Sequence, residues 1–173
     1  MDVAVLVLRL FVGLLLVGHG TQKLFGWFGG HGIAGTGGFM ESIGFRPGKL
    51  MALLAATGEL VGGGSLALGL LTPLGGAATI AVMLNATVPH WGKGPFANNG
   101  GWELAGAYAV VGGTLAFVGP GTISLDHAFG WHLTNTGWGV AATIVGLAAA
   151  GLNLGVRAIG QRSHGNAGGA QPA

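Results

Sequence analysis

Long apolar stretches, each close to the length of a membrane crossing, alternate along the chain with segments rich in glycine, proline and polar residues. A bilayer's hydrocarbon core is about 30 Å thick and needs roughly 17–25 apolar helical residues. The pattern therefore predicts five membrane helices, at residues 3–24, 50–71, 74–88, 102–118 and 138–154. The stretch at 74–88 is short for a full crossing, which leaves open whether it crosses or re-enters on the same side.

Proline marks the boundaries between these stretches. Pro47 precedes the second stretch, and Pro73 follows so closely on its end that the second and third stretches are expected to form a tight antiparallel hairpin. Two connections are longer than a turn. Residues 29–38 are expected to form a loop, and residues 39–45 fit either a short interfacial helix or more loop.

Composition places the protein in a membrane. Only 7% of the 173 residues are charged, whereas an average soluble domain has about 25%, and half are apolar. The absence of cysteine excludes thiol chemistry, and a net charge of +2 without basic clusters argues against nucleic acid as a partner. The sequence predicts an all-α integral membrane protein in contact with the lipid bilayer.

The first stretch is expected to stay in the mature protein. A signal peptide opens with basic residues, whereas this stretch opens with Asp2 and carries Arg9 inside its apolar run. With five crossings, all basic residues except Arg9 fall on one side of the membrane. Because basic loops stay in the cytoplasm, we predict a multi-pass protein of the cell membrane with its N-terminus outside and its C-terminus inside.

Several polar residues are predicted to lie in the cytoplasmic half of the membrane, where a charge costs about 2.5–3.5 kcal/mol and is a functional candidate by default. Helical rise places them there from four different helices. The candidate catalytic residues are His19, Lys23, Glu59 and Glu103. The candidate ligand-binding residues are Asn85, His90, Trp91 and Trp102.

Each candidate also has a structural interpretation. Lys23 could extend to the membrane interface, Glu103 could stabilise the N-terminus of its helix, and Asn85 could bond a neighbouring backbone. Glu59 lies too deep to reach the interface and must be ion-paired or protonated. Helical position favours Lys23 over Arg9 as its partner.

Arg9 belongs to the opposite half of the membrane, and Asp126 follows the fourth stretch on that side. We expect a structural ion pair between them that fixes the outer loop to the bundle. A dedicated metal site is the less favoured reading, because the histidines lack recognisable ligand spacing. Its ligands would be His19 and His90 with Glu59 or Glu103, and we predict no metal.

Five short motifs, in order, resemble the DoxX family of small bacterial membrane proteins. They are Leu8-Arg9-Leu10, His19-Gly20-Thr21-Gln22-Lys23, Thr57-Gly58-Glu59-Leu60, Asn99-Gly100-Gly101-Trp102-Glu103 and Ser124-Leu125-Asp126. The resemblance covers roughly residues 5–130 and implies a four-helix transmembrane bundle. It also implies a link to membrane redox processes such as quinone reduction and oxidative-stress responses. The family's recurrent polar positions fall on Arg9, His19, Lys23, Glu59, Glu103 and Asp126.

The predicted organisation is a DoxX-like four-helix domain at 1–130, an additional transmembrane helix at 131–156 and a disordered cytoplasmic tail at 157–173. The favoured function is a redox-associated membrane protein whose polar pocket binds a quinone or a similar small aromatic. The alternative is a non-catalytic anchor that assembles soluble redox enzymes at the cytoplasmic face through residues 39–49, the Lys93 loop and the tail. A transporter is less favoured because no internal repeat is found, and the sequence is compatible with a homo-oligomer.

Overall fold

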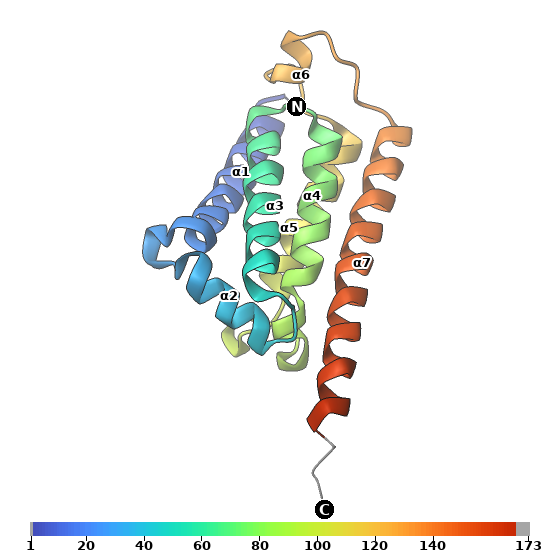
Figure 1. The fold of residues 1–173 in the computed structure, drawn as a ribbon. Helices are drawn as coiled ribbons and strands as arrows, with labels where there is room; N and C mark the ends of the chain where they lie inside the picture. Colours follow the sequence, from blue (N-terminus) through green and yellow to red (C-terminus); the bar gives the residue numbers. More distant parts are fainter. Residues whose placement is uncertain (1, 169–173) are drawn as a thin grey trace, which may run out of the picture.

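The computed structural model describes the backbone of residues 2–168 and the side chains of residues 2–161. Within this part of the chain, the long helices lie side by side as a bundle (Figure 1). They are α1 (Asp2–Phe25), α3 (Gly48–Leu68), α4 (Thr72–Ala86), α5 (Glu103–Val118) and α7 (Thr136–Gly168). The connections contain α2 (Gly32–Ser42), α6 (Leu125–Ala128) and three 3₁₀ turns, η1 (Trp27–Gly29), η2 (Val88–Lys93) and η3 (Ala97–Asn99).

The architecture is an all-α membrane fold, as the sequence predicted: a four-helix bundle of α1, α3, α4 and α5 with the additional helix α7. The first four predicted stretches agree with these helices to within three residues at each end. The short α4 runs along the bundle beside α3 (Figure 1). It starts beside the end of α3 and leads at its other end into α5, which returns (Figure 1).

The connection after α1 corrects one prediction. Residues 29–38 were expected to be loop, but α2 is helical from Gly32 to Ser42 despite its four glycines. Gly37 is buried, and its Cα faces the backbone of Lys49 at the start of α3, so closely that an added Cβ would lie 3.1 Å from Lys49 Cα. Packing against α3 therefore outweighs the poor helix propensity of glycine.

The C-terminal segment also differs from the prediction. The fifth helix does not end near residue 156, because α7 continues to Gly168. The predicted disordered tail is thus helical over residues 157–168, and its remainder, residues 169–173, lies outside the described residues. One structural reason is Arg157, whose Nε donates to the carbonyl of Ile43 at 2.8 Å and so fixes this part of α7 to the end of α2.

Glycine allows α1 and α3 to approach closely. A Cβ added to Gly13 would lie 2.5 Å from the carbonyl oxygen of Gly63, and one added to Gly63 would lie 2.5 Å from that of Gly13. Only a residue without a side chain fits at either position. In a membrane, where helices gain little from the hydrophobic effect, such close contact is a main source of association.

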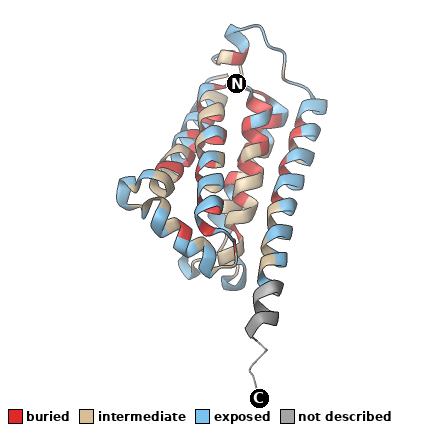
Figure 2. Ribbon diagram, in the orientation of Figure 1, coloured by how far each residue is buried: buried red, intermediate tan, exposed pale blue. Residues whose placement is uncertain are grey.

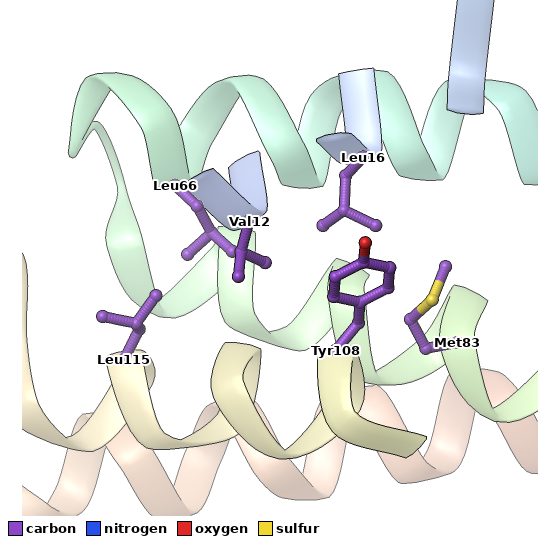
Figure 3. Packing of buried hydrophobic residues seen from close by; sticks show 6 residues of the cluster. All are labelled: Val12, Leu16, Leu66, Met83, Tyr108 and Leu115. Carbon is purple, nitrogen blue, oxygen red and sulfur yellow. The ribbon is translucent and has the colours of Figure 1, made fainter. Parts of the chain in front are cut away.

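The bundle centre is built from one or two side chains of each helix. Val12 of α1 lies beside Leu66 of α3, and Leu16 of α1 lies beside Tyr108 of α5 (Figure 3). The remaining members are Met83 of α4 and Leu115 of α5. α7 joins through a smaller cluster of three alanines, Ala77, Ala116 and Ala142. Small side chains on both surfaces bring α7 close to α4 and α5.

The outer surface of the bundle is apolar. Exposed residues follow the outward face of α1 and of α7, as Figure 2 shows for the whole bundle. They include Val3, Val7, Phe11 and Leu14 on α1, and Val140, Ile144, Leu147 and Leu152 on α7. Helices α1, α3 and the Thr136–Gln161 part of α7 are long and apolar enough to cross a membrane, while α4 and α5 are shorter apolar helices.

Candidate functional site

A cavity of about 590 Å³ lies in the half of the bundle nearest the C-terminal end of α7. Its wall is mostly apolar and comes from α2, α3, α4 and α7, with Phe39, Met51, Val82 and Leu152 among the lining residues. Five polar residues share this wall: Lys23, Glu59, Asn85, His90 and Asn153. An apolar cavity with a few polar groups is the usual form of a small-molecule site.

The cavity opens between α3 and α7. Two of its lining residues, Leu54 of α3 and Leu152 of α7, are 53% and 74% exposed, so they stand at its mouth. Both belong to the apolar outer surface described above. The cavity is therefore bounded on this side by apolar side chains of the outer surface.

The deepest polar group of the site is the Glu59 carboxylate. Glu59 is 2% exposed, and Lys23 Nζ lies 2.7 Å from each of its carboxylate oxygens. The pairing with Lys23 that helical position favoured is therefore present. The lysine reaches Glu59 from the last turn of α1, and its side chain is 25% exposed. Both residues of this pair line the cavity.

Two amides join α4 to α7 at the cavity wall. Asn85 Nδ2 donates to the carbonyl of Ala81 at 2.8 Å, and Asn153 Nδ2 donates to Asn85 Oδ1 at 3.1 Å. The first bond is the backbone contact that the structural interpretation of Asn85 anticipated. The second was not anticipated, because Asn153 lies 68 residues further along the chain.

His90 lies just beyond α4, in η2, and also lines the cavity. Its Nδ1 is 2.6 Å from the carbonyl oxygen of Gly100. A carbonyl can only accept, so Nδ1 carries the proton, and in the neutral ring Nε2 is then an acceptor.

The structure does not bring His19 into the cavity. His19 Nδ1 lies 2.9 Å from Gln22 Oε1, and its ring is 6.3 Å from that of Tyr108, so it lies on the side of α1 that faces α5. Lys23, one turn further along α1, does line the cavity. Helical depth alone could not separate these two residues.

Glu103, Trp91 and Trp102 also lie outside the cavity. Glu103 is exposed in the first turn of α5, the position that its structural interpretation requires, and it also accepts from the backbone N–H of Ala97 in η3 at 2.9 Å. The two indole rings stack at 6.1 Å, with Trp91 70% exposed. The two tryptophans predicted as ligand-binding residues therefore do not line the cavity, whose aromatic side chains are Phe39 and Phe45.

At the opposite end of the bundle, Arg9 is 1% exposed and bonds only to backbone oxygens. Its Nε and Nη2 donate to Leu66 and Ala67 at 2.9 and 3.1 Å, and Nη1 donates to Pro120 and Ile123. The first two carbonyls belong to the C-terminal end of α3, where the helix dipole favours a positive charge.

Asp126 binds the N-terminal end of the following helix, α4. It is fully buried, and its carboxylate accepts from the N–H of Leu71 at 2.7 Å and from the N–H and hydroxyl of Thr72 at 3.0 and 2.9 Å. This is the positive end of the α4 dipole. Leu71 has a left-handed φ of 51°, a conformation that is costly for leucine and that the bond to Asp126 stabilises.

The prediction of an ion pair between Arg9 and Asp126 is therefore wrong, because each side chain binds other partners. Among the described residues, Lys23 and Glu59 form the one carboxylate–cation pair within 4.0 Å. Arg9 and Asp126 act on the same hairpin but bind the ends of α3 and α4 separately. A helix end offers several backbone partners in fixed directions, whereas a carboxylate would satisfy only part of the guanidinium.

Three of the five motifs lie in the part of the chain that the comparison with protein families covers. A family model described as DoxX matches residues 4–91, about half of the chain. The chain belongs to the DoxX family. No curated protein and no solved structure matches it.

In this DoxX protein the family match covers α1 to α4 and stops at Trp91, so it includes Lys23, Glu59, Asn85 and His90 but not α7. Asn153 was missed as a site residue, although it is the one amide in the apolar stretch 138–154. Arg157 was counted only for orientation. It also packs 5.5 Å from the centre of the Phe45 ring, which lines the cavity.

Proposed function

We propose that this DoxX-family membrane protein binds a quinone or a similar small aromatic molecule in the cavity between α3, α4 and α7. The observation that carries the proposal is a 590 Å³ apolar cavity, open toward the bilayer, whose wall contains an ion pair, two amides and an imidazole. A quinone headgroup needs hydrogen-bond partners beside an apolar wall, and its tail needs an apolar exit.

The charges of the site suit a reaction partner that gains or loses protons. Glu59 is held by Lys23, which is itself partly exposed at the cavity. A carboxylate and an ammonium in contact can exchange a proton with a bound hydroxyl or carbonyl within hydrogen-bond distance. We propose this redox-linked role for the Lys23–Glu59 pair, with Asn85 and His90 orienting the headgroup.

Ligand-dependent melting tests the proposal. The protein is purified in lipid nanodiscs and melted with 2-decyl-1,4-benzoquinone or with decylbenzene, which has the same tail and no carbonyl groups. We expect the benzoquinone to raise the melting temperature and decylbenzene to have little effect. Equal shifts with both compounds would mean that the cavity holds only an acyl chain, and no shift with either would contradict the proposal.

Two neighbouring alanines of α7 provide a matched pair of variants. Both alanines are exposed, but Ala149 lines the cavity and Ala148 does not. Ala149→Trp should fill the mouth of the cavity and abolish the benzoquinone shift. Ala148→Trp should keep it, and loss of the shift in both variants would point to a general change in α7.

The alternative role, anchoring soluble redox enzymes, is favoured by one observation. Arg46, Lys49 and Lys93 are exposed in the connections at the end of the bundle where α7 has its C-terminus. Reversing the charges of Arg46 and Lys49 should then remove co-purifying partners, while Glu59→Gln should not. A quinone site gives the opposite result.

We further propose that this basic end faces the cytoplasm, as the positive-inside rule indicates. A reporter that is active only in the cytoplasm, fused after the C-terminal residue, should be active. An inactive reporter, together with an active one fused to the N-terminus, would invert the orientation.

A further inference from the structure

The amide of Asn153 is oriented by a chain of hydrogen bonds that begins in the α4 backbone. Asn85 Nδ2 donates to Ala81, which leaves Asn85 Oδ1 as an acceptor, and Asn153 Nδ2 donates to it. The carbonyl oxygen of Asn153, Oδ1, then has no hydrogen-bond donor among the described residues. Asn153 is half-buried and lines the cavity, so this oxygen is available to a ligand there.

α7 supplies more of the wall than this amide. Ala149, Leu152 and Val156 line the cavity beside Asn153. Arg157 holds the same part of α7 to the carbonyl of Ile43, another lining residue, at 2.8 Å. Asn153 is therefore held to α4 through Asn85, and the next turn of α7 is held to the end of α2 through Arg157. A residue must have such a fixed position to discriminate between ligands.

The second available acceptor lies across the wall. With Nδ1 of His90 donating to Gly100, Nε2 of the neutral ring can accept a hydrogen bond from a ligand. The Glu59 carboxylate, in contrast, has Lys23 Nζ at 2.7 Å from both oxygens. Among the described residues, Asn153 Oδ1 and His90 Nε2 are thus uncharged acceptors at the cavity without a protein donor, whereas both oxygens of Glu59 already contact a cation.

We infer that Asn153 of α7 is a specificity-determining residue that accepts a hydrogen bond from an aromatic hydroxyl, so that the site favours dihydroxy aromatics, the reduced form of a quinone. The inference rests on the proposed function. A neutral acceptor matches a phenolic O–H, which must donate when buried, whereas a molecule without O–H would leave Asn153 Oδ1 unpaired.

Two probes that differ only in the O–H groups test this inference. They are 2-decylhydroquinone and its dimethyl ether, measured without oxygen by titration of the protein in nanodiscs. The wild type should bind the hydroquinone about tenfold more tightly. Asn153→Leu should reduce this preference about fivefold, the effect of one neutral hydrogen bond.

Asn153→Gln keeps both the amide N–H donor and the acceptor oxygen and should keep more of the preference than Asn153→Leu. The preference between the two probes is a readout that a purely structural role of Asn153 would not change. Thr143→Val is the control, because Thr143 is a polar residue of the same helix that bonds to Gly139 and does not line the cavity. An unchanged preference in Asn153→Leu, or an equal loss in Thr143→Val, would overturn the role of Asn153.

The wild type separates this inference from the proposed function. Equal binding of both probes would leave an aromatic-binding cavity and would overturn the preference for hydroxyl groups. Binding of neither probe, together with no melting shift by the benzoquinone, would overturn both.

Discussion

The two charged clusters of this protein use similar residues in opposite ways. At one end, Arg9 and Asp126 are buried and bind backbone groups at the ends of α3 and α4. At the other end, Lys23 and Glu59 bind each other at the wall of a cavity. The first cluster closes a hairpin and leaves no space, while the second leaves charged and polar groups within reach of a ligand.

The difference shows how a buried charge can be assigned to structure or to function. A charge whose partners are backbone atoms of the fold has nothing left to offer a ligand, and removing it damages the fold. A charge paired with one opposite side chain can be neutralised together with that partner. The two clusters should therefore respond differently to double substitutions.

The largest effect is expected at Arg9. Arg9→Met removes the donor that binds four backbone carbonyl oxygens and the positive charge at the C-terminal end of α3. We therefore expect a loss of about 3–5 kcal/mol in the free energy of unfolding. Reversible unfolding by SDS in mixed micelles measures this loss. The exposed Arg46→Met should change stability by less than about 0.5 kcal/mol.

The double variant Arg9→Met with Asp126→Asn should be no more stable than Arg9→Met alone, because neither residue is the other's direct partner. If the second change restored stability, the two residues would act as a pair after all, and the contrast between the clusters would disappear.

The next effect concerns the cavity pair. Lys23→Met leaves the buried Glu59 carboxylate without its cation, and because Lys23 is partly exposed we expect a loss of about 2–3 kcal/mol, below the range of fully buried pairs. Adding Glu59→Gln should restore most of the stability, since the unpaired charge is gone. The same unfolding assay compares the three variants.

Ligand binding in these variants then separates function from structure. The Lys23→Met, Glu59→Gln double variant should be stable and yet lose the benzoquinone melting shift. A double variant that regains both its stability and its redox activity in cells would show that the pair is structural only.

The contact between α1 and α3 should couple the two clusters. Gly63→Ala places a Cβ 2.5 Å from the carbonyl of Gly13, between Arg9 and Lys23 on α1, so the helices must move apart. We expect a loss of about 1–3 kcal/mol and weaker binding at the cavity. Gly64→Ala, where an added Cβ meets nothing within 4 Å, should be neutral or slightly stabilising.

The smallest effect is expected for the amide pair. A double-mutant cycle with Asn85→Ala and Asn153→Ala, measured by the same unfolding assay, should give a coupling energy of about 0.6 kcal/mol, the average for interhelical hydrogen bonds in membranes. A coupling above about 2 kcal/mol would give this bond a structural weight comparable to that of the ion pair.

The sequence by itself determined the helices that cross the membrane. Their lengths and apolar content follow from the thickness of the bilayer, a constraint that acts on each segment separately. It also indicated the Lys23–Glu59 pairing, because the helical rise per residue places both side chains in the same half of the membrane. For the same reason it selected Asn85 and His90 at the correct level of the bundle.

The tertiary structure decided which side of each helix faces which neighbour. Depth placed His19 and Glu103 with the site, but His19 faces α5 and Glu103 lies at the exposed start of α5. Helix α2 forms because it packs against α3 at Gly37, a contact that no local propensity reveals.

The partners of Arg9 and Asp126 had no sequence signature, since every residue has a backbone carbonyl and nearly every residue an N–H. Asn153 meets Asn85 across 68 residues only because small side chains let α7 pack against α4. The depth of a residue along its helix can thus be predicted from the sequence. Contacts between helices depend on the rotation of each helix about its own axis, which only the assembled bundle fixes.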